Sequence, residues 1–181
     1  MGNTYRDIPS LMHHKERELF LECLRHAPDG DCVDLGVYRG SSAAMMCDVR
    51  GTSSGVWILD NGCRAVRTSD KSGIDDALRR LKALGYTPKA LRQNSFDPPP
   101  DGIRVAALSI DTDHVGEVVA KEMDCWRPTL VPGAIVLLHD CNKKEFPCLV
   151  AEVDRRFTEP EWEFLGQAVS LRAYRLRGEV A

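Results

Sequence analysis

Five titratable side chains follow two apolar segments of the sequence at short spacing. Asp111, Asp113 and His114 come directly after one segment, and His139 and Asp140 come directly after the next. If the two segments are neighbouring parallel strands, their carboxyl ends meet at one edge of the sheet and bring these side chains together. Two carboxylates held close together repel unless a cation or a shared proton intervenes. Asp111 and Asp140 therefore suggest a divalent-cation site with oxygen ligands, for which magnesium is the natural candidate.

The same cluster offers a third metal ligand and a base. We take Asp111, His139 and Asp140 as the candidate metal-binding residues. The imidazole of His114 can take up a proton at neutral pH, and the neighbouring carboxylate of Asp113 would raise its basicity. Asp111, His114 and Asp140 are thus the candidate catalytic residues. In the alternative interpretation the aspartates cap the following loops, His139 forms a hydrogen bond in the core and His114 begins a helix.

A loop with two glycines follows the first strand-like segment and reads Asp34-Leu35-Gly36-Val37-Tyr38-Arg39-Gly40-Ser41. Gly36 and Gly40 would let the backbone turn close to a ligand, and a helix beginning at Ser41 would direct free N–H groups towards it. The loop lacks the Gly-x-Gly-x-x-Gly of dinucleotide-binding proteins and the Gly-Lys-Ser/Thr of phosphate-binding loops. The carboxylate of Asp34 either holds the loop through its N–H groups or lies near a cationic ligand, and both can hold together.

Two further groups of polar residues fit an adenosine ligand. Asp60 ends the second strand-like segment, where a carboxylate can accept both hydroxyls of a ribose. That position serves a nicotinamide dinucleotide and S-adenosylmethionine equally well. Asn94, Ser95 and Phe96 follow the third segment, where they could hold an adenine ring or simply form a turn with an Asx or Ser cap.

Strand-like and helix-like segments alternate along the chain. Strands are expected at 32–37, 55–60, 89–92, 105–110 and 134–138. Helices are expected after a Ser10 cap as far as Ala27, from Ser41 to just before Gly51, and at 74–84. Two more are expected from His114 to Trp126, with Val115 turned inward, and from Pro147 to Phe157. This order predicts an α/β fold with a doubly wound parallel sheet and helices on both faces. The segments 162–166 and 170–176 have no helix between them and predict a terminal antiparallel hairpin.

Taken in order, four segments resemble the class I S-adenosylmethionine-dependent methyltransferases. The segments are 33–42, 57–60, 108–114 and 132–140. The resemblance is greatest to the small-molecule O-methyltransferase branch of cation-dependent type, in which the first loop reads acidic-x-Gly-x-x-x-Gly-x-Ser. It extends from the first strand to the terminal hairpin and implies a Rossmann-like, mostly parallel sheet of seven strands that includes the hairpin.

The resemblance also implies a donor site for S-adenosylmethionine. Its methionine part would lie against the glycine loop, its ribose at Asp60 and its adenine at 94–96. The residues assigned to this site are Asp34, Gly36, Tyr38, Arg39, Gly40, Ser41, Ser42, Asp60, Asn61, Asn94, Ser95, Phe96, Asp111 and Asp113. Tyr38 and Arg39 stand where the more common Gly-x-Gly-x-Gly loop of the family has its central glycine.

The acidic pair matches the family as well. Asp111 and Asp140 stand at the positions of the metal-binding acids of cation-dependent catechol-type and sugar O-methyltransferases, which use the ion to bind and acidify a substrate hydroxyl. His114 stands where the catechol-type enzymes carry a base. Cys141, however, stands where those enzymes have an asparagine.

The composition narrows the setting in which the protein works. A length of 181 residues suits one domain, with residues 1–30 as an N-terminal helical segment that caps the pocket and 31–181 as the methyltransferase domain. A net charge of -3 and scattered Lys and Arg residues argue against nucleic acid as a partner. Seven cysteines without metal spacing indicate a reducing cytoplasm, with Cys32, Cys47 and Cys148 as small buried hydrophobes. No signal or membrane-spanning segment is expected.

The function expected from the sequence is methyl transfer to a hydroxyl of a small-molecule acceptor, with S-adenosylmethionine as cofactor and with assistance from Mg²⁺. Alternatives are an S-adenosylmethionine-binding protein with a regulatory or non-methyl role, an NAD(P)-dependent oxidoreductase and a non-catalytic interaction module. A homodimer through the hairpin edge is a further expectation. Neither the acceptor nor the pathway can be read from the residues.

Overall fold

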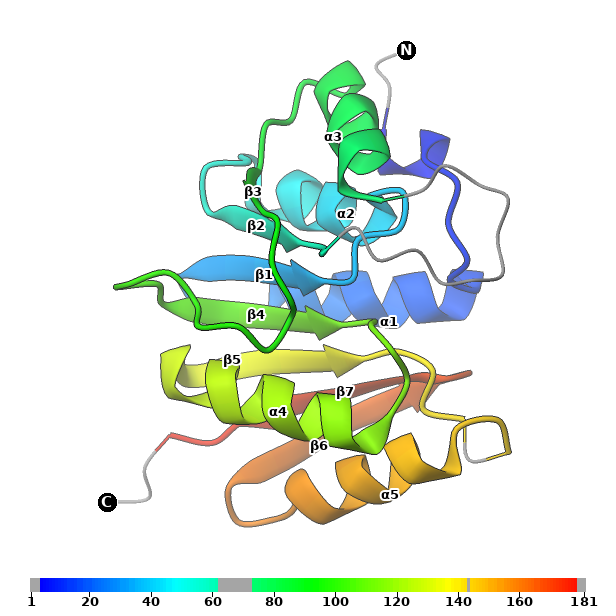
Figure 1. Ribbon diagram of the computed structural model, residues 1–181, viewed down its shortest axis with the longest axis vertical. Helices are drawn as coiled ribbons and strands as arrows, with labels where there is room; N and C mark the ends of the chain where they lie inside the picture. The colour runs from blue at the N-terminus through cyan, green and yellow to red at the C-terminus, as the bar shows by residue number, and fades with distance from the viewer. Residues whose placement is uncertain (1–3, 62–72, 143, 179–181) are drawn as a thin grey trace.

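The computed structural model describes residues 4–61, 73–142 and 144–178, which form a seven-stranded sheet flanked by helices (Figure 1). The strands lie in the order β3-β2-β1-β4-β5-β7-β6. Their bounds are Asp31–Leu35 (β1), Val56–Leu59 (β2), Lys89–Leu91 (β3), Val105–Ile110 (β4), Leu130–Leu138 (β5), Trp162–Ala168 (β6) and Leu171–Leu176 (β7). Only β7 runs antiparallel to its neighbours β5 and β6. The expected Rossmann-like sheet with a C-terminal hairpin is confirmed.

Helices cover both faces of this sheet (Figure 1). On one side lie α1 (His14–Arg25), α2 (Ser41–Arg50) and α3 (Ile74–Ala83), and on the other lie α4 (Gly116–Trp126) and α5 (Pro147–Arg156). Two short 3₁₀ helices, η1 (Tyr5–Asp7) and η2 (Arg127–Thr129), complete the list. Side chains of β1 alternate between the two layers, because Val33 and Leu35 join the core under α4 and α5 whereas Cys32 joins the core under α1 and α2.

The carboxyl ends of the parallel strands are aligned at one edge of the sheet. The backbone N–H groups of Gly36, Asp111 and His139 donate to the last residues of neighbouring strands, over distances of 3.1, 2.9 and 3.0 Å. The hairpin reaches the same edge, where the N–H of Cys141 donates to the carbonyl of Ser170 at 2.8 Å. Residues that follow β1, β4 and β5, and those that precede β7, are therefore placed side by side, as in other open α/β sheets.

Several element boundaries differ from the expected ones. The first helix begins at His14 with His13 as its N-cap, whereas the hydroxyl of Ser10 accepts from the N–H of Met12 in the preceding turn. The fourth helix begins at Gly116, so Val115 precedes it and is 45% exposed rather than turned inward. Cys148 is exposed and is not the buried hydrophobe expected, since it lies in the outer first turn of α5.

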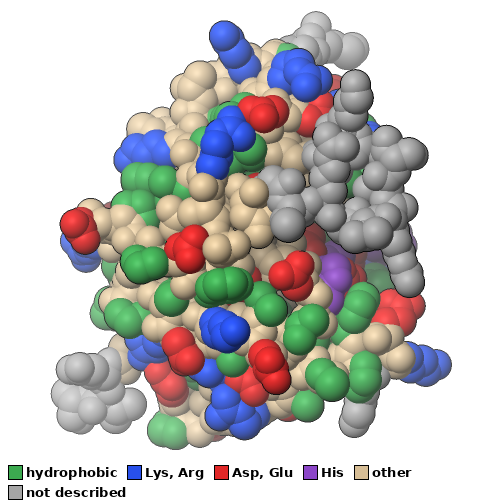
Figure 2. Space-filling view, viewed as in Figure 1, with side chains coloured by type: hydrophobic (Ala, Val, Ile, Leu, Met, Phe, Trp, Pro, Cys, Tyr) green, Lys and Arg blue, Asp and Glu red, His purple; other side chains and the backbone are tan. Residues whose placement is uncertain are grey.

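The face formed by α4 and α5 carries dispersed charges (Figure 2). Basic side chains on this face stand among acidic ones, and Arg127 and Arg156 form ion pairs with Glu161 and Asp124 at 2.5 and 2.7 Å. This face therefore offers no continuous basic surface. Among the described residues, no helix combines the length and the apolar character that crossing a bilayer requires.

Candidate active site

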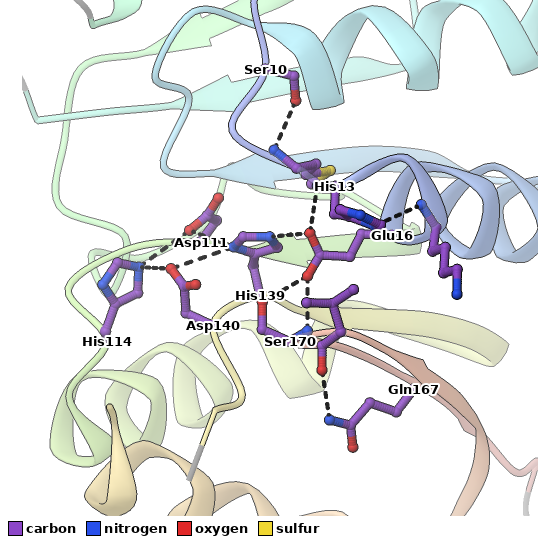
Figure 3. A network of polar contacts seen from close by, with 12 residues as sticks. Ser10, His13, Glu16, Asp111, His114, His139, Asp140, Gln167 and Ser170 are labelled. Carbon is purple, nitrogen blue, oxygen red and sulfur yellow. Dashed lines mark hydrogen bonds and ion pairs between the residues drawn. The ribbon is translucent and has the colours of Figure 1, made fainter. Parts of the chain in front are cut away.

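Two aspartates and two histidines meet at the carboxyl edge of the sheet (Figure 3). Asp111 follows β4, His139 and Asp140 follow β5, and His114 lies in the turn before α4. Nε2 of His114 lies 2.9 Å from Oδ2 of Asp140 and 3.3 Å from Oδ1 of Asp111. Nδ1 of His139 lies 3.4 Å from Oδ2 of Asp140 and 3.7 Å from Oδ1 of Asp111. The structure thus brings together the residues predicted to carry metal and base chemistry. Asp113, by contrast, is exposed.

The backbone at this edge adopts conformations that L-residues rarely take. His114 and Asp140 have φ angles of 54° and 56°, and Tyr38 in the first loop has a φ of 44°. Each such left-handed residue costs on the order of 1–3 kcal/mol, and such residues concentrate at functional sites. The turn at His114 also explains why it does not begin the helix, since a left-handed residue cannot continue into α-helical geometry.

The charges of the cluster compensate one another. The carboxylates of Asp111 and Asp140 raise the pKa of His114 to about 9. Burial alone would raise the pKa of Asp140, but hydrogen bonds from His114 and His139 outweigh burial and lower it well below its usual range. The same balance lowers the pKa of Asp111. The two imidazoles therefore already offset the repulsion between the carboxylates, so that repulsion does not by itself require a cation.

The geometry and the donor set nevertheless fit a metal ion. One ligand atom from each of Asp111, His139 and Asp140 lies within 4.8 Å of the other two. Nδ1 of His139 is buried and lies beside both carboxylates, at 3.4 and 3.7 Å, with no hydrogen bond in ideal geometry among the described residues. A cation between these three groups would replace this loose contact with metal–ligand bonds. Because imidazole nitrogen suits transition metals whereas carboxylates suit Mg²⁺ and Mn²⁺, this set fits Mn²⁺ at least as well as Mg²⁺.

One residue of this network, Glu16 in the first turn of α1, was not predicted from the sequence. Glu16 is 2% exposed, and its carboxylate lies 3.3 Å from Nε2 of His139. The sequence does contain a pattern that indicates its burial, because Glu16 falls on the same face of the helix as the buried residues Phe20 and Cys23. A lone carboxylate on an apolar helix face requires a buried partner.

The two glycines of the first loop allow parts of the protein to approach one another. A Cβ atom on Gly36 would lie 1.9 Å from the carbonyl oxygen of Asp111, so this glycine allows the ends of β1 and β4 to come together. A Cβ atom on Gly40 would meet Ala77 and Leu81 of α3 at 3.2 and 3.3 Å. Gly40 is assigned to the donor site, but a side chain at this position would point into the packing of α3, so Gly40→Val would disturb the fold.

Asp34 lies near the end of β1, just before the first loop, and is fully buried. Its Oδ2 accepts a short hydrogen bond from the hydroxyl of Ser42, in the first turn of α2. Burial raises the pKa of Asp34 to about 7, although the hydrogen bond from Ser42 acts in the opposite direction. Oδ1 of Asp34 and the hydroxyl of Ser41 are buried without hydrogen-bond partners among the described residues.

The residues assigned to the ribose and adenine lie at the ends of β2 and β3. The side-chain amide of Asn61 donates to Oδ1 of Asn94 at 3.1 Å, which brings the two strand ends together next to Asp60. The segment 94–97 forms a turn, in which the N–H of Asp97 donates to the carbonyl of Asn94 at 3.1 Å and the side chain of Asp97 accepts from the N–H of Asn94 at 2.8 Å. The carbonyl groups of Ser95 and Phe96 accept from α4. The turn interpretation is therefore satisfied, and an adenine contact at 94–96 stays a prediction. Residues 62–72, which follow Asn61, lie outside the described residues.

Comparisons with known proteins agree with this fold. Residues 33–141 match the family model described as a methyltransferase domain. Among solved structures, the O-methyltransferase NovP has a TM-score of 0.66 and 19% identity, with 97% of this chain and 87% of NovP covered. CalS11, a TDP-rhamnose 3'-O-methyltransferase of calicheamicin biosynthesis, has a TM-score of 0.63 and 12% identity over 87% of this chain and 76% of its own.

An rRNA methylase from Streptococcus thermophilus is similar to a comparable degree, with a TM-score of 0.62 and 14% identity over 92% of this chain and 99% of its own. None of the curated proteins matches the sequence. The family model covers more than half of the chain and includes the glycine loop and the Asp111 and Asp140 cluster. The chain therefore belongs to the methyltransferase domain family and is a class I S-adenosylmethionine-dependent methyltransferase.

Proposed function

We propose that the protein transfers the methyl group of S-adenosylmethionine to a hydroxyl of a small molecule, with help from a divalent cation at Asp111, His139 and Asp140. The observation that carries this proposal is the convergence of these three ligand atoms within 4.8 Å of one another. They lie directly beside the first loop, because Gly36 packs against the backbone of Asp111. A hydroxyl held at the cluster would therefore face a donor held over the loop.

The reaction breaks the bond between the sulfonium sulfur and the methyl carbon and forms a bond between that carbon and the acceptor oxygen. The sulfonium becomes a neutral thioether, and the hydroxyl proton must leave. A cation at the cluster would supply orientation of the hydroxyl and a lower pKa for it. His114 contacts both Asp111 and Asp140, which hold its pKa at about 9. A cation that drew those carboxylates to itself would lower this pKa, and the neutral imidazole would then be placed to receive the proton.

The surface near the cluster favours an acceptor with an apolar body. Four large apolar side chains are exposed among the described residues, and three of them, Leu11, Val115 and Val169, are close in sequence to residues of the polar network. Val115 follows His114 directly, and Val169 precedes Ser170, which bonds to Glu16. Phe146 adds a ring 4.8 Å from the ring of His114. These side chains could contact an aromatic or aliphatic acceptor.

An RNA acceptor is the alternative of a different class, since a similar fold occurs in an rRNA methylase. RNA binding relies on a basic surface that neutralises phosphates. The net charge of -3 and the ion-paired arginines of the α4 and α5 face do not provide one. A small-molecule acceptor is therefore the function that the site supports better.

The test combines binding and turnover. Calorimetry would measure S-adenosylmethionine affinity and, separately, Mn²⁺ and Mg²⁺ affinity for the native protein and for Asp111→Asn, Asp140→Asn and the exposed control Glu117→Gln. We expect both aspartate variants to lose cation binding. Asp140→Asn, which lies outside the residues assigned to the donor, should retain donor binding, and the control should be unchanged. Mass spectrometry of reactions with a panel of phenols and sugars would then report methylation. Full turnover in excess chelator would remove the cation from the proposal and leave methyl transfer itself intact.

A further inference from the structure

The carboxylate of Glu16 connects three separate segments of the chain at the edge of the active site (Figure 3). Oε2 accepts from the backbone N–H of His13 at 2.8 Å and lies 3.3 Å from Nε2 of His139. Oε1 accepts from the backbone N–H and from the hydroxyl of Ser170, at 2.9 and 2.7 Å. Glu16 thus joins α1, the residue after β5 and the turn of the terminal hairpin.

The ring of His139 faces a different group on each side. The side chain is 9% exposed, with Nε2 directed at Glu16 and Nδ1 directed at Asp111 and Asp140. A carboxylate can only accept a hydrogen bond, so the contact with Glu16 requires the proton to be on Nε2. When a cation displaces the proton from Nδ1, the lone pair of that nitrogen faces the aspartate cluster.

We propose that Glu16 is a positioning residue of the cation site: it holds the Nε2–H of His139 so that Nδ1 can serve as a metal ligand. This inference rests on the proposed function, because it assumes that Asp111, His139 and Asp140 bind a cation. Histidines that bind metals commonly donate their other ring N–H to a carboxylate or carbonyl, which fixes the ring and raises its basicity as a ligand. Glu16 is the group that meets this requirement in the polar network.

A purely structural role explains only part of the contacts of Glu16. Its bond to His13 completes the capping box of α1, and its bonds to Ser170 attach the hairpin to the helix. Those three contacts leave the approach to His139 unexplained. All four partners are hydrogen-bond donors, which calls for a group that only accepts.

Two variants separate positioning from structural support. Glu16→Gln keeps the size of the side chain but places an amide where only acceptors fit, so the contact with His139 or with Ser170 is weakened. Ser170→Ala removes a hydrogen bond to the same carboxylate, retains the backbone N–H of residue 170 and leaves the His139 contact in place. Both variants would be compared with the native protein for thermal unfolding, for Mn²⁺ and Mg²⁺ affinity by calorimetry without donor or acceptor, and for the Nε2–H signal of His139 by NMR.

We expect Glu16→Gln to weaken cation affinity by about 10–100-fold and to lose the slowly exchanging Nε2–H signal. Ser170→Ala should lower stability but change cation affinity by no more than about 2-fold, within the scatter expected for a lost neutral hydrogen bond away from the ligand. Native affinity in Glu16→Gln, or an equal loss in both variants, would overturn the positioning role while the cation site stands. If the native protein binds neither ion, both the inference and the cation in the proposed function are overturned. Calorimetry of S-adenosylmethionine binding would still test the methyltransferase part of the proposal separately.

Discussion

Nε2 of His114 lies 2.9 Å from Oδ2 of Asp140, so the candidate base shares a carboxylate with the candidate metal site. The same imidazole lies 3.3 Å from Asp111. Any cation at the cluster must therefore compete with His114 for the two carboxylates. This coupling makes His114 the residue at which binding and turnover can be separated experimentally.

Replacement of His114 by alanine is expected to preserve or strengthen cation binding, because it frees both carboxylates from an ion pair. Turnover should fall by about 100-fold or more if the imidazole receives the hydroxyl proton. Calorimetry with Mn²⁺ and single-turnover methylation assays would measure the two effects. His14→Ala is a suitable control, since that imidazole is exposed at the start of α1. Unchanged turnover in His114→Ala would exclude His114 as the base.

A second prediction concerns the approach of β1 to β4. Gly36→Ala places a Cβ atom against the carbonyl oxygen of Asp111, at 1.9 Å, and does so at a φ of 85°. Left-handed strain and overpacking together should cost more than about 3 kcal/mol of unfolding free energy. Gly85→Ala is the matched control, because Gly85 has a φ of 86° but an added Cβ meets nothing within 4 Å. Denaturant unfolding should show a loss of only about 1–2 kcal/mol there. Equal losses in both variants would mean that the close approach is not the cause.

Donor recognition is expected to depend on Asp60, at the end of β2. Asp60→Ala should weaken S-adenosylmethionine binding by about tenfold, or about 1.4 kcal/mol, because the ribose hydroxyls lose their acceptor. NAD should bind neither protein, since the first loop lacks the dinucleotide fingerprint. Asp101→Ala, an exposed change before β4 and thus at the opposite edge of the sheet, serves as control. Calorimetry that finds native donor affinity in Asp60→Ala would remove Asp60 from the site.

Asp34 should make the stability of the donor-free protein depend on pH. Burial raises its pKa from 3.8 to about 7, so the folded state holds the proton more tightly than the unfolded chain does. A carboxyl shifted in this direction favours folding below the unfolded pKa, and this contribution is lost as pH rises through the folded value. Between pH 4 and 7, about the span of the two pKa values, native stability should therefore fall relative to Asp34→Asn.

Unfolding free energies measured across this pH range would test the expectation, because the difference between the two proteins isolates Asp34 from the histidines. A difference that does not change with pH would show that Asp34 ionises normally in the folded state.

Local patterns in the sequence were enough to predict the elements and their order. The apolar segment 105–110 is β4 with the same bounds, and Gly51 ends α2 as expected. Strand periodicity, glycine stops and the missing helix before 170–176 led to the sheet and its antiparallel hairpin. Parallel topology then placed Asp111 and Asp140 at one edge, because the residues after adjacent parallel strands are neighbours whatever the side chains do.

Tertiary structure alone decided how the side chains are used. Glu16 and His139 are 123 residues apart, and their contact depends on how α1 crosses the sheet. What a Cβ atom on Gly40 would contact depends on how α3 packs against α2. The turn at His114 arises because the chain must cross from β4 to α4 beside Asp140. Local periodicity specifies which face of an element is buried, but it does not specify the register and crossing angle between elements, and these determine which polar groups meet.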